Sequence, residues 1–188
     1  MSGDRLERLR TVMQQQGLDA LLVTSATNRR YLTGFTAADH APDELSAVAI
    51  VSRDGAWLLA PATNVAWAAS EAATGIQIQQ WERPWTSSVV ALIREAGWRR
   101  LGIEDATTTV AVYNQLREAL GEAVALVPVG HAVDALRASK DQVEIALLER
   151  ALRLTDEAFM AAERRLQAGM TEADAAEIIR EALRAVGS

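Results

Sequence analysis

The 188-residue sequence contains no cysteine and only two histidines, and both scarcities exclude classes of protein. Without cysteine there is no disulfide scaffold, no thiolate metal site and no cysteine nucleophile. A zinc or two-metal site needs several histidines and carboxylates at close spacing, which His40 and His131 alone do not provide. The Gly-rich phosphate loops, His-Glu-x-x-His and Gly-x-Ser-x-Gly are also missing. The sequence therefore contains no complete catalytic motif.

The sequence also lacks an excess of basic charge and any long hydrophobic run. Its 19 Lys and Arg residues stand against 25 Asp and Glu residues, so the formal net charge is -6. This balance argues against nucleic acid or an anionic membrane as the main partner, because both attract basic surfaces. No segment has the length of a signal core or a membrane span, so we expect a cytoplasmic protein. Hydrophobic residues make up 49% of the chain, which is enough for a sizeable core.

Residues 1–133 alternate short apolar runs with amphipathic helical patterns. The apolar runs predict strands at residues 19–24, 45–52, 56–60, 76–81, 100–104 and 124–128. Asp54-Gly55 predicts a hairpin between the second and third of them, and therefore an antiparallel pair. The pattern predicts an α/β domain with a mixed β-sheet flanked by helices.

Residues 134–188 are helical in pattern and form a second predicted unit. A wide apolar stripe on one helix comprises Ile145, Leu148, Leu152, Thr155, Phe159, Ala162 and Leu166. Gly169 ends this helix, and Thr171 with Asp174 resembles a capping box that begins another. Two such helices bury little apolar surface against each other. We therefore expect either a second copy of the chain or a missing part of a longer protein to cover this C-terminal helical hairpin.

The segment 28–35 is the strongest candidate for binding. It places Arg29, Arg30, Tyr31 and an aromatic ring beside the turn at Gly34. Guanidinium groups are planar forks of donors, so this segment could bind a carboxylate. The alternative is a capped short helix whose aromatic side chains pack inward, and residue chemistry favours neither.

Six other residues, in four groups, have a structural and a functional interpretation. His40 could be a solvated loop residue and His131 a cap or surface residue. Glu104-Asp105 follows a predicted strand, where carboxylates often bind ligands, but helix capping by Asp105 is the simpler expectation. Trp81 and Trp85 flank Pro84 and could line a pocket or pack at an edge.

Two ordered groups of residues resemble the creatinase/prolidase family, which includes Xaa-Pro dipeptidases and aminopeptidases with the "pita-bread" catalytic fold. The first group is Gly17-Leu18-Asp19-Ala20-Leu21-Leu22-Val23-Thr24, Asn28 and Tyr31-Leu32-Thr33-Gly34-Phe35. The second is Arg137, Ser139-Lys140, Glu144-Ile145, Ala151, Thr155-Asp156 and Gly169-Met170-Thr171-Glu172. On this resemblance, residues 1–133 are the family's N-terminal α/β domain. Residues 134–188 are then the linker and first two helices of a truncated catalytic domain.

The resemblance implies a function that the chain shares with a longer polypeptide. Family members hydrolyse their substrates with two divalent metal ions (Mn, Co or Zn), whose ligands lie downstream of these helices. We therefore expect no catalytic and no metal-binding residue in this chain, and no activity from it alone. The N-terminal domain would cover the substrate, a peptide or small amide, and help to form a homodimer. Arg30, Tyr31 and His40 would contact the substrate.

The segment after the second hairpin strand departs from the family pattern. Many relatives have Asp-x-Arg-Tyr there, whereas this chain reads Leu59-Ala60-Pro61-Ala62-Thr63-Asn64. A creatinase-like hydrolase of a small amide or amidine metabolite is therefore an alternative. A non-catalytic protein-binding module of the same fold is another, because a fold does not determine a function.

Overall fold

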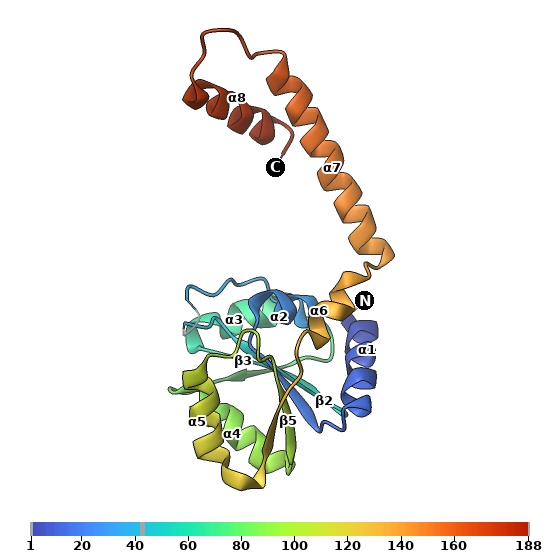
Figure 1. Ribbon diagram of the computed structural model, residues 1–188, viewed down its shortest axis with the longest axis vertical. Coiled ribbons are helices and arrows are strands. Elements are labelled where there is room, and N and C mark those ends of the chain that lie inside the picture. The colour runs from blue at the N-terminus through green and yellow to red at the C-terminus, as the bar shows by residue number, and fades with distance from the viewer. Residues whose placement is uncertain (1, 42–43, 188) are drawn as a thin grey trace. The chain divides into compact units, whose positions relative to one another are not determined.

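The computed structural model describes residues 2–41 and 44–187, which form two compact units (Figure 1). One unit ends at Ala138 and the other begins at Ser139. The first is an α/β domain and the second a pair of helices.

The first unit is built on a six-stranded sheet in the order β4-β3-β2-β1-β5-β6. Its strands are β1 (Ala20–Val23), β2 (Val48–Ser52), β3 (Ala56–Ala60), β4 (Gln77–Gln80), β5 (Arg100–Ile103) and β6 (Ala125–Pro128). The β1–β2 and β2–β3 pairs are antiparallel, and the other three pairs are parallel. The predicted hairpin joins β2 to β3, and the mixed α/β fold is confirmed.

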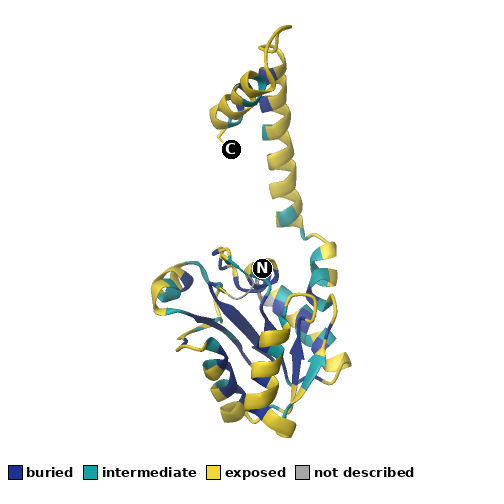
Figure 2. Ribbon diagram, turned by 60° about the vertical axis from the view of Figure 1, so that its left-hand side comes forward, coloured by how far each residue is buried: buried dark blue, intermediate teal, exposed yellow. Residues whose placement is uncertain are grey.

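Helices cover both faces of this sheet, because its central strands β1 and β2 are buried on both sides. One face carries α1 (Ser2–Gln15), α2 (Ala26–Thr33), α3 (Ala62–Glu71) and α6 (Ala132–Ala138). The other carries α4 (Trp85–Ala96) and α5 (Val110–Leu120), which is followed by the short 3₁₀ helix η1 (Gly121–Ala123). Strand β1 shows the alternation clearly: Leu21 and Val23 join the first core, and Ala20 and Leu22 join the second. Figure 2 shows the buried strands between the two helical layers.

A buried glutamate, Glu104, lies at the carboxyl ends of two neighbouring strands, after which the chain continues on opposite faces of the sheet. The parallel neighbours β1 and β5 lead to helices on opposite faces, and Glu104 directly follows β5. Its carboxylate accepts hydrogen bonds from the backbone nitrogens of Thr24 (2.7 Å) and Ser25 (2.9 Å) and from Nδ2 of Asn28 (2.7 Å). Burial raises the pKa of Glu104 above its ordinary value, although these hydrogen bonds act in the opposite direction.

The same network holds α6 on the first unit. Arg137 donates from Nη1 to Oδ1 of Asn28 (3.0 Å) and to Oδ1 of Asp134 (3.1 Å). Arg8 donates to the carbonyl oxygen of Leu136 (3.1 Å). Helix α6 therefore packs with the α/β domain, and the division between the compact units falls after it rather than after residue 133.

The second unit consists of α7 (Gln142–Glu163) and α8 (Glu172–Ala185), the predicted helical hairpin. Both helices begin with a capping box, Asp141 with Glu144 in α7 and the predicted Thr171 with Asp174 in α8. The two helices share a small core formed by Ala158, Ala162, Ile178 and Ala182. Most of α7 is exposed (Figure 2), including Leu147, Leu152 and Phe159, whose exposed fractions are 60%, 62% and 66%.

The raised pKa of Glu104 predicts a specific pH dependence of stability. A group whose pKa is higher in the folded than in the unfolded protein stabilises the fold below its unfolded pKa, about 4.3 for glutamate. That contribution is lost as the pH rises through the folded pKa. Urea unfolding of the wild type and of Glu104→Gln, measured from about pH 4 to pH 7, should therefore show the wild type losing stability relative to the variant. A difference that grows in favour of the wild type with rising pH would mean that the hydrogen bonds to the carboxylate outweigh its burial.

Candidate functional site

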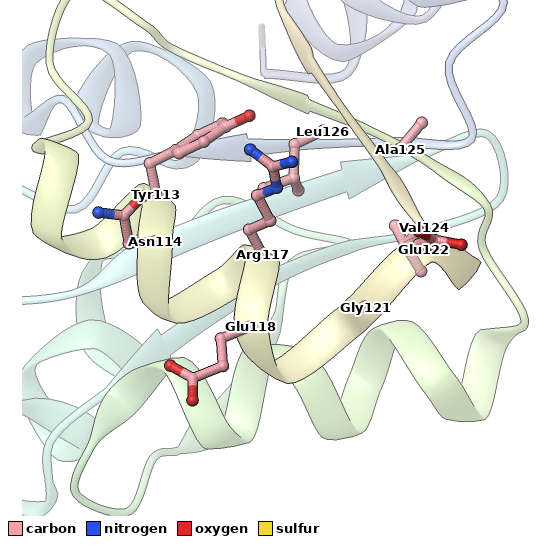
Figure 3. A pocket seen from close by; sticks show the side chains of 9 residues that line it. All are labelled: Tyr113, Asn114, Arg117, Glu118, Gly121, Glu122, Val124, Ala125 and Leu126. Atoms are coloured by element: carbon pink, nitrogen blue, oxygen red, sulfur yellow. The ribbon is translucent and has the colours of Figure 1, made fainter.

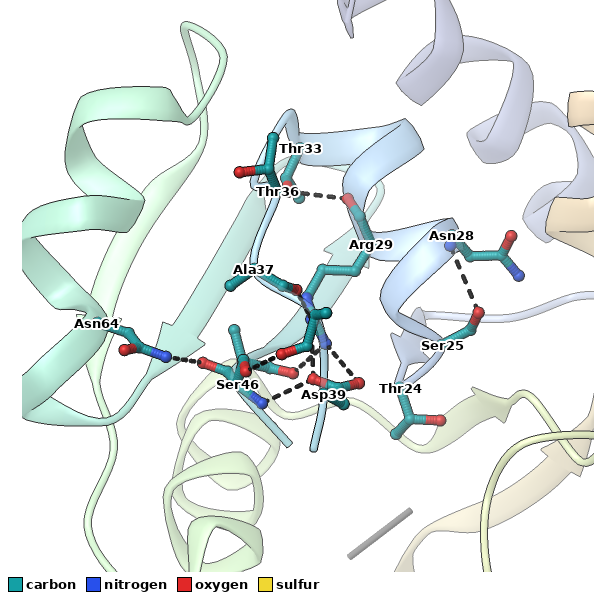
Figure 4. Close-up of polar contacts among 12 residues, drawn as sticks. Thr24, Ser25, Asn28, Arg29, Thr33, Thr36, Ala37, Asp39, Ser46 and Asn64 are labelled. Atoms are coloured by element: carbon teal, nitrogen blue, oxygen red, sulfur yellow. Dashed lines mark hydrogen bonds and ion pairs between the residues drawn. The ribbon is translucent and has the colours of Figure 1, made fainter. Parts of the chain in front are cut away.

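Arg29 is the largest fully buried side chain in the described part of the chain, and it fixes the loop that follows α2 (Figure 4). Ser25 caps α2 by accepting a hydrogen bond from the backbone nitrogen of Asn28 (3.4 Å), and Gly34 ends the helix in the left-handed conformation. In this short helix Arg29 faces the interior, whereas Arg30 is exposed.

The Arg29 guanidinium binds three points of the loop. It forms an ion pair with Asp39, with Nη2 donating to Oδ1 (3.0 Å) and Nη1 to Oδ2 (3.3 Å). Nη1 also donates to the carbonyl oxygen of Ala47 (2.6 Å), and Nη2 to that of Ala37 (2.8 Å). The guanidinium carbon lies 5.9 Å from the centre of the Phe35 ring, within range of a cation–π interaction. One side chain thus joins the two ends of the 37–47 segment.

Asp39 extends this network toward α3. Its Oδ1 accepts a hydrogen bond from the backbone nitrogen of Ser46 (2.7 Å), and the Ser46 hydroxyl donates to the carbonyl oxygen of Ala38 (2.5 Å). Asn64, in the first turn of α3, donates from Nδ2 to the carbonyl oxygen of Ser46 (3.0 Å; Figure 4). The loop is therefore held from α2 on one side and from α3 on the other.

This loop forms one wall of a cavity of about 700 Å³, which we call the His40 pocket. The pocket lies beyond the carboxyl ends of the parallel strands β3 and β4, where α/β proteins often bind ligands. Three segments line it: the loop, the start of α3, and the connection from β4 to α4. The lining residues are His40, Glu44, Leu45, Ser46, Pro61, Thr63, Asn64, Trp81, Arg83, Pro84 and Trp85.

The pocket combines aromatic, charged and backbone groups. The rings of Trp81 and Trp85 lie 6.2 Å apart, centre to centre, at an angle of 34°. Helices α3 and α4 both begin at the pocket, at Pro61 and Pro84, and neither has a side-chain cap. Their first backbone N–H groups therefore contribute partial positive charge there. The volume is typical of a site for a small ligand.

The structure distributes the three expected substrate contacts over two places. His40 is exposed and lines the His40 pocket, whereas Arg30 and Tyr31 are not among its lining residues. Arg30 is exposed on α2, and its charge helps to lower the pKa of Glu71, after the larger effect of hydrogen bonding. Tyr31 is buried, with its hydroxyl donating to the carbonyl oxygen of Leu136 (3.4 Å) and the Arg5 guanidinium 4.3 Å from its ring centre.

For the segment 28–35 the structure shows the second interpretation, a capped short helix whose aromatic side chains pack inward, whereas binding of a ligand carboxylate stays a prediction. The aromatic rings of Tyr31 and Phe35 pack inward, and Arg29 is buried, whereas Arg30, the arginine expected to contact the substrate, is exposed. No sequence signal singles out the pairing of Arg29 with Asp39, because the loop that contains Asp39 also contains the acidic residues Asp43 and Glu44.

The expectation that Asp105 caps a helix is wrong. Helix α5 is capped by Thr109, whose hydroxyl accepts a hydrogen bond from the backbone nitrogen of Val112 (3.2 Å). Asp105 instead accepts a hydrogen bond from the backbone nitrogen of Gly130 (2.7 Å) and so ties the end of β5 to the segment before α6.

A second cavity of similar volume lies between α5 and the edge strand β6 (Figure 3). Tyr113, Arg117 and Leu126 are among its lining residues, and Glu118 projects away from Arg117. This cavity lies at the amino end of β6, whereas α/β proteins commonly bind ligands at the carboxyl ends of their parallel strands, so it is the weaker candidate.

Residues 2–41 and 44–187 offer neither a metal-binding cluster nor a membrane-spanning helix. No three His, Asp or Glu side chains in these ranges gather closely enough to hold a metal ion. No helix in the same ranges is both long and apolar enough to cross a membrane.

Substitution of Arg29 should destabilise the domain far more than substitution of its neighbour. Arg29→Met removes one partner of a buried ion pair, which typically costs about 3–5 kcal/mol of unfolding free energy. Arg30→Met, one residue away on the exposed side of α2, is the matched control and should change it by less than about 0.5 kcal/mol. Urea unfolding followed by circular dichroism measures both. Equal effects of the two substitutions would contradict the structural role of Arg29.

Comparison with known proteins gives a consistent result for this domain. Residues 5–139 match the model of the Creatinase/Prolidase N-terminal domain. Over 155 residues the chain is 32% identical to the "Uncharacterized peptidase YqhT" of Bacillus subtilis (strain 168), covering 82% of this chain and 41% of that protein.

Solved structures show the same relationship. The Xaa-Pro dipeptidase from Bacillus anthracis is 26% identical, with a TM-score of 0.88 over 100% of this chain and 50% of that one. The N-terminal domain of the cytoplasmic peptidase PepQ from Mycobacterium tuberculosis H37Rv is 28% identical, with a TM-score of 0.62 over 71% of this chain and 98% of that one. The chain thus spans half or less of the length of the B. subtilis peptidase and the B. anthracis dipeptidase. It belongs to the creatinase/prolidase N-terminal domain family.

Proposed function

We propose that this chain is the N-terminal, substrate-covering and dimerising portion of a metal-dependent Xaa-Pro peptidase. The observation that carries the proposal is the family match over residues 5–139, together with the likeness to an Xaa-Pro dipeptidase over the whole chain. The His40 pocket supports it, because a domain that covers a substrate needs an ordered concave surface.

In this proposal the chemistry and the coverage of the substrate are divided between two parts of a longer polypeptide. The two divalent metal ions (Mn, Co or Zn) would be held by the other part and would activate the attacking water. This chain would bind and orient a peptide and shield it from solvent. The polypeptide would act in the cytoplasm, as the name of the PepQ relative suggests.

His40 and Arg30 are the proposed substrate-side contacts, because both are exposed on the first unit. Tyr31 is buried, so its proposed contribution is to hold the helix on which Arg30 lies. The Arg29 network gives His40 a fixed backbone, and a fixed contact loses less conformational entropy when a substrate binds.

One observation favours the alternative of a creatinase-like hydrolase of a small amide or amidine. Pro61, Thr63 and Asn64 line the His40 pocket. They belong to the segment in which the resemblance to the family implies a charged Asp-x-Arg-Tyr sequence. A pocket without those charges could accept a different substrate. A non-catalytic binding module has no comparable support.

A homodimer is proposed because α7 exposes large apolar side chains. Leu147, Leu152 and Phe159 are each at least 60% exposed within the second unit, and apolar patches of this kind commonly mark interfaces. Light scattering on the chain should give the mass of a dimer, and a monomer at micromolar concentration would contradict this part of the proposal.

Hydrolysis assays test the function directly. With Mn²⁺ added, the longer polypeptide should cleave Ala-Pro, and this chain alone should show no turnover. In the longer polypeptide, His40→Ala should lower kcat/KM by about tenfold, the loss expected for one polar contact to substrate. His131→Ala, an exposed histidine outside the His40 pocket, is the control and should leave kcat/KM unchanged. Cleavage of a small amide but not of Ala-Pro would replace the proposal with the creatinase-like alternative.

A further inference from the structure

The outer side of β4 is an open strand edge. Strand β4 ends the sheet on its side, and no strand within residues 2–41 and 44–187 pairs with its outer edge. Trp81, directly after β4, donates its backbone N–H to the carbonyl oxygen of Ala60 on β3 (2.9 Å). Because alternate residues of a parallel strand bond to the same neighbour, the odd-numbered residues of β4 face β3. Ile78 and Gln80 therefore direct their backbone N–H and C=O groups away from the sheet.

The opposite edge of the sheet, β6, is protected against pairing, whereas β4 is not. Val129, directly after β6, donates its backbone N–H to the carbonyl oxygen of Ile103 on β5 (3.0 Å), so the preceding Pro128 faces outward. Proline offers no N–H to an approaching strand, and proline or charged residues commonly protect edge strands in this way. Strand β4 reads Gln-Ile-Gln-Gln and contains neither. Its backbone groups are therefore available to another strand.

The surface beside this edge carries almost no charge. Charged residues make up 23% of the chain, but residues 56–81 contain only one, Glu71. Its carboxylate accepts hydrogen bonds from the backbone nitrogen and the hydroxyl of Thr36 (both 2.8 Å). Helix α3 contacts β3 and β4 and is mostly exposed, with Trp67 46% exposed and its ring edge-on to that of Phe35 (5.4 Å between centres). Depletion of charge around an exposed aromatic residue is typical of a protein–protein interface.

The distribution of charge indicates a second copy of the chain as the partner. Each copy has a formal net charge of -6, so two copies repel one another over most of their surfaces. The β4 edge and α3 allow them to approach without this repulsion. A strongly basic or acidic partner would find no opposite charges to pair with on this surface.

Antiparallel pairing of two β4 strands about a two-fold axis satisfies the open backbone groups of both. When Ile78 of each copy lies opposite Gln80 of the other, each of these residues donates one hydrogen bond and accepts one. Gln79 then lies on the axis, opposite Gln79 of the second copy. A charged residue there would repel its own copy, whereas a glutamine amide can both donate to and accept from its equivalent. The strand is thus complementary to itself.

We propose that the chain forms a homodimer through the outer edges of two β4 strands. The two six-stranded sheets then form one continuous sheet, with α3 of both copies on the same face. The inference rests on the proposed function only for the existence of a homodimer. It assigns to the α/β domain a contact that is separate from the exposed side chains of α7.

Charge substitutions at Gln79 test the inference, because in this pairing Gln79 lies opposite its own copy. In sedimentation velocity experiments on the 188-residue chain, Gln79→Lys and Gln79→Glu should each raise the dissociation constant of the dimer at least about tenfold, since like charges then meet on the axis. An equimolar mixture of the two variants should recover the wild-type affinity, because a mixed pair places opposite charges there. This recovery also shows that both variants are folded. Gln115→Lys, at an exposed glutamine of α5, is the matched control and should dimerise as the wild type does.

A dissociation constant that is unchanged in the Gln79 variants, or that does not recover in their mixture, would overturn the β4 pairing. In the longer polypeptide the amides of Ile78 and Gln80 should exchange with solvent more slowly as the dimer forms. Slow exchange that is independent of protein concentration would show that another part of the same polypeptide covers the edge, and would also overturn it. A monomeric wild-type chain would contradict the proposed homodimer together with this inference. Failure of the longer polypeptide to cleave Ala-Pro would overturn the proposed peptidase function alone.

Discussion

The buried ion pair between Arg29 and Asp39 is the interaction on which the candidate site depends. A guanidinium removed from water is costly unless nearly all its donors are used, and Arg29 gives four hydrogen bonds to the loop that follows its helix. The loop conformation is thereby restricted to one that brings Asp39 and the carbonyl groups of Ala37 and Ala47 together. His40 follows Asp39 directly in the sequence. The buried contacts of Arg29 therefore fix the position of this wall of the pocket.

Helix α2 connects this wall to the far side of the domain. Its adjacent residues Asn28 and Arg29 serve two networks: Asn28 bridges the buried Glu104 to Arg137 on α6, and Arg29 holds the loop at the His40 pocket. Eight residues are too few for a helix to be stable by itself, and these tertiary contacts supply what local propensity does not. The two groups of family-like residues, far apart in the sequence, thus meet in the structure at Asn28 and Arg137.

Much of this fold could be predicted from the sequence, and less of the site. Apolar periodicity and the Asp54-Gly55 turn were sufficient for the strands, the hairpin and the mixed sheet, because those features are local. The pairing of Arg29 with Asp39 could not be predicted, since a period of 3.6 residues does not say which of two adjacent arginines faces inward in a single two-turn helix. Trp81 and His40 were each noted, but their meeting in one pocket depends on the order β4-β3-β2, which no local pattern specifies. The role of Asp105 was misjudged because its partner, Gly130, lies 25 residues away.

The dependence of the pocket wall on the Arg29–Asp39 pair is tested most directly by hydrogen exchange at the Ser46 amide. This N–H donates to the Asp39 carboxylate in the native domain. In Asp39→Ala the Ser46 amide should exchange with solvent at least about tenfold faster, because it loses one charge-assisted hydrogen bond. The amides of β1 and β5 should keep their protection. Unchanged exchange at Ser46 would show that the loop holds its conformation without the ion pair, and would contradict the dependence of the pocket wall on Arg29 and Asp39.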